Sequence, residues 1–413
     1  MKNILILCPT LRDLREIPRL GYNHNYIYEG ADTREILSSF DPLVFIEYVI
    51  KKIKHEKIDA VIGTHDYPAS IMASIIANMI GSDGVNVAAN FLCQHKYYSR
   101  EMQSRLFGPM VPEYKLLDPF QKEDPPYGFP FFLKPVKSFF SILACRIENT
   151  NQFLKYMEAS RAHIQEFVEP FNRMLKKYTL LPVGAGYVMA EKICTGQQVN
   201  LEGYVYKGQV FFIGITDSIM YKDTQSFKRF DYPSSIDSAV QQRMMDVSRV
   251  WLSHLNYGNG LFNIEFFYNR RNKSLSIIEI NPRMCSQFAD LVEKVDGINT
   301  YRLQLDLSLG KKPDYSFNRK GKFKFGSSFV LRKFSDMKVL SVPSPQQIKQ
   351  VMNKFEEARI EIYAYPGKNL SATLQDARSY RYGVINLGGN SREELKSKFD
   401  FWRRALKFKF QKI

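Results

Sequence analysis

Two apolar stretches separated by a polar turn constrain the fold of this chain more than any other feature of its sequence. Residues 262–268 and 275–280 have the composition of β-strands, and the turn centred near Asn272 indicates a hairpin. With that centre, Glu265 on the first strand lies opposite Glu279 on the second. The hairpin therefore brings two carboxylates together within an otherwise apolar pair of strands.

The second strand adds another polar side chain to this face. Because successive side chains point to opposite faces, Glu279 and Asn281 share one face, while Ile278 and Ile280 take the other. Two carboxylates about 5 Å apart repel by roughly 3 kcal/mol at an effective dielectric near 20, so the pair favours a bound cation. Carboxylate and amide oxygens suit Mg²⁺, with Mn²⁺ as an alternative. We therefore predict a metal site at Glu265, Glu279 and Asn281. The competing interpretation is a solvent-facing strand pair with salt bridges to Arg270, Arg271 or Arg283.

The first hundred residues alternate between strand and helix patterns. We expect strands at residues 4–7, 58–63 and 85–89, and helices at 42–54 and 69–80. Such alternation predicts a doubly wound parallel sheet, in which ligands bind beyond the carboxyl ends of the strands. Thr64, His65 and Asp66 follow the second strand and therefore indicate a possible substrate site, with capping of the next helix as the alternative role of Asp66.

The pattern changes after residue 110 and again after Pro313. The central part has an apolar strand at 129–136 that carries Lys134, further strands up to residue 280, and two long helices. The last part combines strands near 324–332 and 359–364 with a basic helix from Ser391. We predict three units: an N-terminal α/β domain at 1–110, a nucleotide- and metal-binding domain at 111–315, and a small basic α+β region at 316–413.

Several function classes are disfavoured by what the sequence lacks. It has no GxGxxG, GxxxxGK[ST] or GxSxG motif, which argues against Rossmann dehydrogenases, P-loop NTPases and α/β-hydrolases. The five cysteines form no CxxC pair and the six histidines lie far apart, which argues against a zinc site or a disulfide framework.

The charge and the apolar segments bear on partners and location. The formal net charge is +16, and many basic residues lie in 319–324 and 396–412. We favour a solvated basic face over a nucleic-acid site, because no recognisable nucleic-acid motif accompanies these residues, although the charge leaves that partner open. The apolar run at 4–7 is too short for a signal peptide, and no stretch has the roughly 20 apolar residues of a membrane helix. We expect a soluble, cytoplasmic protein without a membrane partner, and leave a homodimer open.

Four motifs resemble those of ATP-grasp enzymes, in the order in which that superfamily has them. After the N-terminal α/β domain these are residues 95–100, 129–135, 189–196, and Glu265 with 279–283. The resemblance covers most of the chain. The motifs are most similar to those of the carboxylate–amine ligase and biotin carboxylase-like branches. It implies a pre-ATP-grasp domain with a doubly wound parallel sheet, followed by a two-subdomain ATP-grasp fold and a small C-terminal α+β region.

The resemblance also implies roles for individual residues around ATP. Lys96 and Lys134 would contact its phosphates, with Ser138 and Ser141 as further donors in a loop that lacks the glycines usual in the family. The hinge would bind adenine through the Glu191 carbonyl and the Cys194 amide. Lys192 and Ile193 belong to the same hinge. Gln198 stands where the family has an acidic residue on the ribose hydroxyls, and would bind them more weakly.

The remaining roles concern the metal and the reaction. By the resemblance, Glu265, Glu279 and Asn281 would hold Mg²⁺ that bridges the phosphates. Arg283 and Lys134 would be the catalytic residues, with Arg283 on the substrate carboxylate or the acyl phosphate. A structural ion pair with Glu279 is the competing role for Arg283.

The function implied is an ATP-dependent ligase that activates a carboxylate as an acyl phosphate for attack by an amine, as in amino-acid or peptide ligases. Small carboxylates and amines are the expected substrates, and the sequence identifies neither. Two alternatives stay open. One is a carboxylase-like enzyme that activates bicarbonate. The other is a regulatory module that binds ATP without turnover, which Gln198 and the glycine-free loop favour.

Overall fold

The N-terminal part of the chain forms a small parallel sheet, as its alternating pattern predicts. The computed structural model describes residues 1–30, 40–138, 142–314, 320–355, 357–373 and 379–413. The sheet has the order β2–β1–β3 and only parallel pairs. Its strands are β1 (Asn3–Leu7), β2 (Asn25–Glu29) and β3 (Ala60–Ile62). The helices that accompany them are α1 (Leu11–Arg19), α2 (Pro42–Lys52), the short η2 (Asp66–Ser70) and α3 (Ile71–Ile80).

The predicted strand at residues 85–89 is wrong. Val85 forms only an isolated bridge with Gly258, and the chain then enters helix α4 (Val87–Gln94). The side chain of Asn86 caps this helix by accepting a hydrogen bond from the Ala89 amide at 3.2 Å. A short run of valine and alanine thus becomes a helix because a capping residue stands before it. The third strand of the sheet is instead β2.

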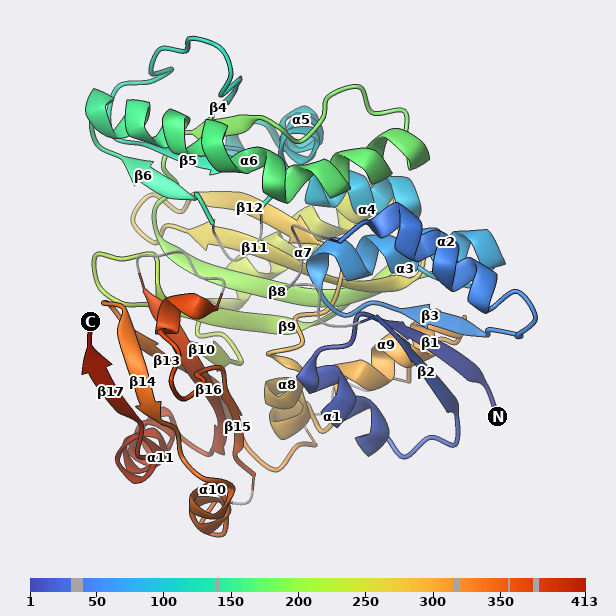
Figure 1. Ribbon diagram of the computed structural model, residues 1–413, viewed down its shortest axis with the longest axis vertical. Coiled ribbons are helices and arrows are strands. Elements are labelled where there is room, and N and C mark those ends of the chain that lie inside the picture. Colours follow the sequence, from blue (N-terminus) through green and yellow to red (C-terminus); the bar gives the residue numbers. More distant parts are fainter. Residues whose placement is uncertain (31–39, 139–141, 315–319, 356, 374–378) are drawn as a thin grey trace.

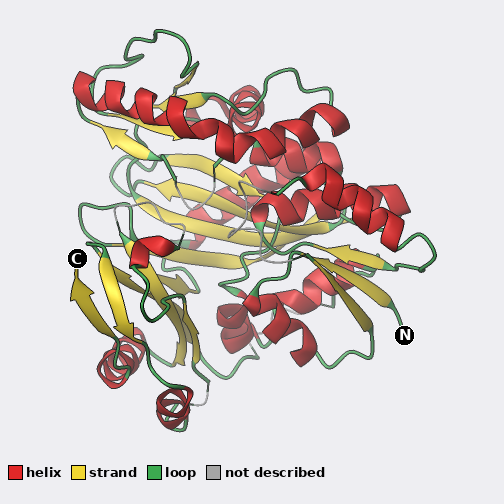
Figure 2. Ribbon diagram, viewed as in Figure 1, coloured by secondary structure: helices red, strands yellow, loops and turns green. Residues whose placement is uncertain are grey.

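A second sheet carries the segment that contains Lys134. It is antiparallel with the order β4–β7–β5–β6, and the long helix α6 lies across it (Figure 1, Figure 2). Its strands are β4 (Tyr114–Leu117), β5 (Phe131–Pro135), β6 (Cys145–Ile147) and β7 (Val188–Glu191). The helices of this part are α5 (Lys96–Phe107), η3 (Gly108–Met110) and α6 (Thr150–Tyr178).

The third sheet has eight antiparallel strands and holds the predicted hairpin at one edge. Its order is β12–β11–β8–β9–β10–β13–β16–β15. Its strands are β8 (Gln197–Tyr206), β9 (Gln209–Met220), β10 (Phe227–Tyr232), β11 (Gly260–Tyr268), β12 (Leu275–Asn281), β13 (Phe325–Lys333), β15 (Arg359–Ile362) and β16 (Tyr380–Gly389). Helices α7 (Ser238–His254), α8 (Ala289–Asp296) and α9 (Thr300–Ser308) connect them. The strands after residue 320 continue this sheet, and the three predicted domain limits stay predictions.

The C-terminal part extends from the free end of the eight-stranded sheet, on the side of the molecule away from the N-terminus (Figure 1). It adds helices α10 (Pro345–Met352) and α11 (Arg392–Ala405), the turn η4 (Leu370–Ala372), and a two-stranded sheet of β14 (Met337–Ser341) and β17 (Lys409–Lys412). The predicted basic helix is therefore followed by an edge strand. Across the described ranges, no helix combines the length and the apolar character that crossing a membrane requires.

Alternation along β8 explains why the eight-stranded sheet has one apolar and one polar face. Val199 and Leu201 are fully buried in a cluster that includes Trp251 of α7. The residues between and beside them are polar, and three of these side chains point to the opposite face: Gln198, Asn200 and Glu202. This polar face carries the candidate site.

Candidate active site

The predicted hairpin lies at the centre of the site. β11 and β12 pair antiparallel, with Glu265 opposite Glu279 and Asn263 opposite Asn281. Asn281 and Asn263 are buried, and the two glutamates are partly buried. The facing of the two carboxylates is therefore as the sequence predicts.

One detail of the hairpin differs from simple alternation. The register shifts after Glu265, so that Phe266 pairs with Ile277 and Ile278 has no partner on β11. Ile277 and Ile280 are buried in the core, whereas Ile278 is half-buried, so its predicted place on the apolar face is wrong. Arg100 of α5 donates a hydrogen bond to the Ile277 carbonyl at 2.9 Å. Helix α5 thus covers an edge strand that a bulge has bent.

The two hairpin carboxylates have pKa values shifted in opposite directions. Burial and the charge of Glu279 raise the pKa of Glu265 to about 8. Burial also opposes ionisation of Glu279, but Lys96 and Lys134 outweigh it and lower the pKa. Lys96 Nζ lies 3.2 Å from a Glu279 oxygen. Glu265 accepts hydrogen bonds from Gln198 at 2.7 Å and, more weakly, from Asn281 at 3.4 Å.

This arrangement fits the metal ion that the sequence predicts. No group of three or more His, Cys, Asp and Glu side chains is arranged to hold a metal in the described part of the chain. The candidate ligands are instead two carboxylates and the Asn281 amide oxygen. Glu265 and Glu279 repel each other, and a divalent cation between them would remove that repulsion. The donor set is therefore suited to Mg²⁺ shared with phosphate oxygens.

A second buried cluster lies beside the hairpin. Lys134 Nζ lies 2.7 Å from one oxygen of Glu191, and Arg100 Nε lies 2.6 Å from the other. Burial would raise the pKa of Glu191, but Arg100 and Lys134 lower it to about 2. Burial also lowers the pKa of Lys134, against the attraction of Glu191. Glu191 thereby fixes Lys134, while the ammonium group retains donors for a further partner.

The four residues of the hinge after β7 differ from one another in how far they are buried. Glu191 is buried and Lys192 is exposed, while Ile193 and Cys194 are half-buried. Lys192 Nζ lies 2.6 Å from Glu113, so its side chain points away from Lys134 and Glu279. Gly196 follows with φ +123°, where an added Cβ would lie 2.3 Å from the Tyr268 carbonyl. The hinge therefore needs glycine to approach β11 closely.

Arg283 has a partner that the sequence did not indicate. Its guanidinium forms two hydrogen bonds with Asp66, Nε at 2.6 Å and Nη2 at 2.7 Å. The predicted alternative, an ion pair with Glu279, is not the one observed. Burial opposes ionisation of Asp66, but Arg283 outweighs it and lowers the pKa. The end of β12 is thus tied to the N-terminal sheet at the segment where ligands were expected.

The loop after β5 is described only in part. Ser138 donates a hydrogen bond to the Ile142 carbonyl at 2.8 Å. Ser141 lies outside the described residues, so its predicted contact with phosphate stays a prediction. Gln198, predicted to bind ribose, is buried on the polar face of β8 and donates to Glu265.

Three charged residues of this cleft were not singled out from the sequence. Arg100 binds Glu191, and Lys137 is buried between η2, α4 and α6. Glu202 accepts a hydrogen bond from the Cys285 amide at 2.9 Å, and burial raises the pKa of Glu202 to about 7. Arg100 lies four residues after Lys96, and that helical spacing was a usable signal. Alternation along β8, which places Glu202 on the same face as Gln198, was a usable signal for Glu202, whereas the sequence contained none for Lys137.

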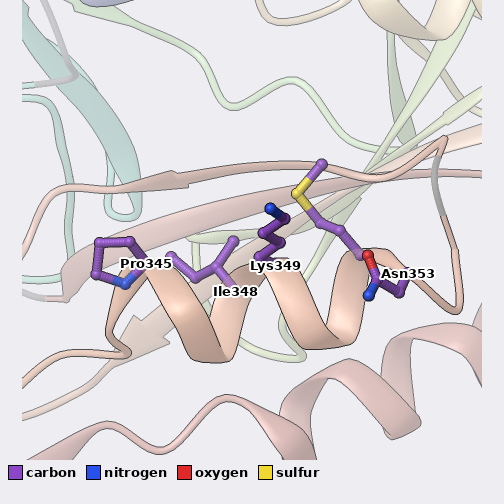
Figure 3. A pocket seen from close by; sticks show the side chains of 5 residues that line it. Pro345, Ile348, Lys349 and Asn353 are labelled. Atoms are coloured by element: carbon purple, nitrogen blue, oxygen red, sulfur yellow. The ribbon is translucent and has the colours of Figure 1, made fainter.

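A hollow elsewhere on the surface does not belong to this site. It has a volume of about 430 Å³ and lies along one side of α10 (Figure 3). Its lining residues are Pro345, Ile348, Lys349, Met352 and Asn353. The lining has one charged side chain and no carboxylate, so it offers no metal ligands of the kind found on β11 and β12.

The comparisons with known proteins agree with this geometry. Residues 127–292 match the profile of the ATP-grasp domain. No curated protein matches the sequence significantly. An L-amino acid ligase from Bacillus licheniformis has a similar structure, with a TM-score of 0.75, 16% identity, and coverage of 100% of this chain and 99% of that one.

Two other solved structures share the fold. A biotin carboxylase from Campylobacter jejuni has a TM-score of 0.65 and 15% identity, covering 100% of this chain and 92% of that one. An N5-carboxyaminoimidazole ribonucleotide synthetase from Thermotoga maritima has a TM-score of 0.65 and 15% identity, covering 99% of both chains. The predicted fold class is therefore confirmed: the chain has the fold of these ATP-grasp structures, and residues 127–292 match the ATP-grasp domain.

Proposed function

We propose that this protein is an ATP-dependent ligase that joins a carboxylate to an amine. The observation that carries the proposal is the repulsion between the facing carboxylates of Glu265 and Glu279, which the cations Lys96 and Lys134 offset at Glu279 but not at Glu265. A magnesium nucleotide supplies a divalent cation for the carboxylates and phosphate groups for the lysines. Such a constellation suits phosphoryl transfer, in which catalysis rests on positioning and on cations around the phosphoryl group.

The residues take the following roles in this proposal. Glu265, Glu279 and Asn281 hold Mg²⁺ or Mn²⁺, which when bound neutralises phosphate charge. Lys96 and Lys134 bind the phosphates, helped by Ser138 and Ser141. The hinge residues Glu191, Lys192, Ile193 and Cys194 border the adenine, and Gln198 binds the ribose.

Arg283 binds the acid that is activated. Its planar guanidinium suits a carboxylate or an acyl phosphate, and it now holds such a group in Asp66. A carboxylate oxygen of the substrate attacks the terminal phosphorus of ATP, and ADP leaves. The nitrogen lone pair of the amine then attacks the acyl carbon, inorganic phosphate leaves, and the amine releases its proton to solvent.

Bicarbonate is the second candidate for the activated acid. It is favoured by the fold shared with a biotin carboxylase and with a 2-oxoglutarate carboxylase domain whose structure contains MgADP and bicarbonate. A non-catalytic nucleotide-binding module is the third candidate, because Gln198 binds Glu265 where an acidic residue is usual in the family. A nucleic-acid-linked substrate, a homodimer and a cytoplasmic location stay predictions.

The test is ADP release by the purified protein with Mg·ATP and pools of amino acids and small carboxylic acids, with and without bicarbonate. We expect one pool to stimulate release, and Glu279→Ala to reduce the stimulated rate by at least about a hundredfold, because the metal loses a ligand. Glu148→Ala is the matched control, since that glutamate is exposed and pairs only with the exposed Arg146. Stimulated release that survives in Glu279→Ala would contradict the metal assignment. Saturable ATP binding without ADP release in any pool would favour the non-catalytic nucleotide-binding module.

A further inference from the structure

Glu202 is a buried carboxylate that the chain leaves without a cation. It lies on the polar face of β8 and is 4% exposed. Most other buried carboxylates of the described residues contact lysine or arginine, while Asp13 and Asp296 accept hydrogen bonds from hydroxyl groups. Glu202 accepts a hydrogen bond from the Cys285 amide at 2.9 Å, and no lysine, arginine or histidine nitrogen of the described residues lies within 4.0 Å of it. Its charge therefore has no cationic partner in this part of the chain.

The strand register places Glu202 on the same face as the metal ligands. Asn281 of β12 lies opposite Asn263 of β11, and Asn263 lies opposite Glu202 of β8, so the three form one row across the sheet. Glu279 and Glu265 form the next row. Because neighbouring strands lie about 5 Å apart, the backbone of Glu202 is roughly 10 Å from that of Asn281. Glu202 thus belongs to the candidate site, two strands in from the edge that carries Glu279 and Asn281.

The segment after β12 leads from the metal ligands to Glu202. The Arg283 amide donates to the Asn281 carbonyl at 2.8 Å, and two residues later the Cys285 amide donates to Glu202 at 2.9 Å. Arg283 therefore stands in the chain between a metal ligand and the residue that contacts Glu202. In the proposed reaction the metal-bound phosphate, the acid and the amine must follow one another in the same order, because the acyl group is joined first to the phosphoryl group and then to the amine. The place of Glu202 in this order is that of the amine.

The chemistry of Glu202 indicates which kind of amine. A carboxylate removed from water is stabilised by a partner that brings both a positive charge and N–H donors, and a primary ammonium group has both. Burial raises the pKa of Glu202 to about 7, so near neutral pH the group can hold an ammonium and can also accept a proton from it. An uncharged nitrogen, such as that of an amide or a urea, would leave the carboxylate without a cation.

We propose that Glu202 binds the amine substrate as a primary ammonium group and thereby selects amines that carry a positive charge in water. The proposal rests on the proposed function, in which Arg283 binds the acid. The bound ammonium transfers one proton to Glu202, and the nitrogen lone pair then attacks the acyl carbon of the acyl phosphate while inorganic phosphate leaves. The nitrogen loses its second proton to solvent, and Glu202 releases the first one there. The α-amino group of an amino acid fits this description, whereas a ureido nitrogen does not.

The test makes two nucleophiles compete for the same acyl phosphate. The purified protein receives Mg·ATP, pooled amino acids and small carboxylic acids, and hydroxylamine, which is uncharged at neutral pH. Mass spectrometry measures the ligated product, and the iron(III) complex measures the hydroxamate. In Glu202→Gln we expect the ratio of ligated product to hydroxamate to fall by about ten- to a hundredfold, the range of a lost charge-assisted hydrogen bond. Hydroxamate should still form, because Glu202 does not contact the acid in the first step.

The substitution is chosen to preserve the surroundings of Glu202. The amide oxygen of glutamine can still accept the hydrogen bond from Cys285, and the loss of an uncompensated charge should leave the unfolding temperature no lower than that of the wild type. Glu148→Gln, at an exposed glutamate, is the matched control and should leave the ratio of the two products unchanged.

A second variant keeps the proposal testable if Glu202→Gln folds poorly. Glu202→Asp keeps the charge but withdraws it by one methylene, so we expect the ratio to fall by about two- to tenfold. A ratio that is unchanged in either folded variant, or as low in Glu202→Asp as in Glu202→Gln, would overturn the role of Glu202. Hydroxamate without ligated product from any amine of the pool would overturn it too. A wild-type protein that forms no hydroxamate with any acid would instead overturn the proposed function.

Discussion

Glu191 on β7 and Glu265 on β11 are carboxylates of the candidate site with opposite surroundings. Glu191 is 5% exposed and contacts two cations, Arg100 at 2.6 Å and Lys134 at 2.7 Å. Those cations hold the pKa of Glu191 at about 2 against the effect of burial. Glu265 is half-buried beside another carboxylate, and both its removal from water and the charge of Glu279 raise its pKa.

The difference between Glu191 and Glu265 distinguishes residues that stabilise the site from residues that are suited to binding a ligand. The charge of Glu191 is compensated within the chain, so this cluster is complete as it stands. Glu265 lies beside Glu279 with no cation within 4.0 Å among the described residues, whereas Glu279 contacts Lys96 at 3.2 Å, and Lys137 contacts no described carboxylate. Uncompensated charges of both signs within one cleft suit a ligand that carries both, such as a metal ion bound to phosphates.

The largest effect should come from removing the compensated carboxylate. Glu191→Leu leaves Lys134 and Arg100 buried without their shared partner. We expect the free energy of unfolding to fall by about 3–5 kcal/mol, the cost of breaking a buried ion pair from one side. Urea denaturation followed by circular dichroism measures it. A loss below about 1 kcal/mol would mean that the cluster is solvated, and the contrast with Glu265 would disappear.

The control for this variant is an exposed pair. Arg146 and Glu148 lie 2.6 Å apart, with half of each side chain exposed. We expect Glu148→Ala to change the free energy of unfolding by roughly 0–1 kcal/mol, as for other surface pairs. The difference between the two variants then reports burial rather than the loss of a glutamate.

The second prediction concerns Glu265. Its replacement should increase the free energy of unfolding, whereas that of Glu191 should decrease it. The pKa of Glu265 in the folded protein is raised from its ordinary value of 4.5 to about 8, by burial and by the charge of Glu279. Its protonated form therefore contributes stability that is fully present below pH 4.5 and is lost as the pH rises through about 8. Glu265→Gln imitates the protonated form at every pH. We expect this variant to be more stable than the wild type by about 1–3 kcal/mol at pH 9, and by much less at pH 6.

Urea denaturation of both proteins without ligand, at the two pH values, measures this difference. Lys137 and Glu202 also titrate near pH 7, but they are present in both proteins and their effects cancel in the comparison. The same variant should lose stimulated ADP release, because it lacks a metal ligand. A stability difference between the variant and the wild type that is the same at pH 6 and pH 9 would show that the pKa of Glu265 is not raised.

Much of this contrast could be predicted from the sequence, because it depends on local pattern. The pairing of Glu265 with Glu279 follows from the turn position alone, and the register confirms it. Lys134 was identified because it interrupts an apolar strand. The polar face of β8 follows from alternation, which places Gln198 on the side of Glu265.

What could not be predicted depends on contacts between distant segments. Asp66 and Arg283 are 217 residues apart, and no local pattern indicates their ion pair. Lys137 follows the strand β5, at a position where a lysine is ordinarily solvated. Its burial arises only when η2, α4 and α6 enclose it. The register shift at Ile278 inserts one extra residue, which strict strand alternation does not predict.

The smallest effect tests a pair that lies between the two extremes. Arg283 and Asp66 compensate each other, as Arg100 and Glu191 do, but their side chains are 16% and 29% exposed and lie beside the uncompensated charges. If Arg283 exchanges Asp66 for the activated acid, Asp66→Asn should cost only about 1 kcal/mol of unfolding free energy. It should also strengthen AMP-PNP binding by about two- to fivefold, because a competing negative charge is gone. Denaturation and calorimetry measure the two effects. Weaker AMP-PNP binding, together with a stability loss as large as that of Glu191→Leu, would place Arg283 among the residues that build the cleft.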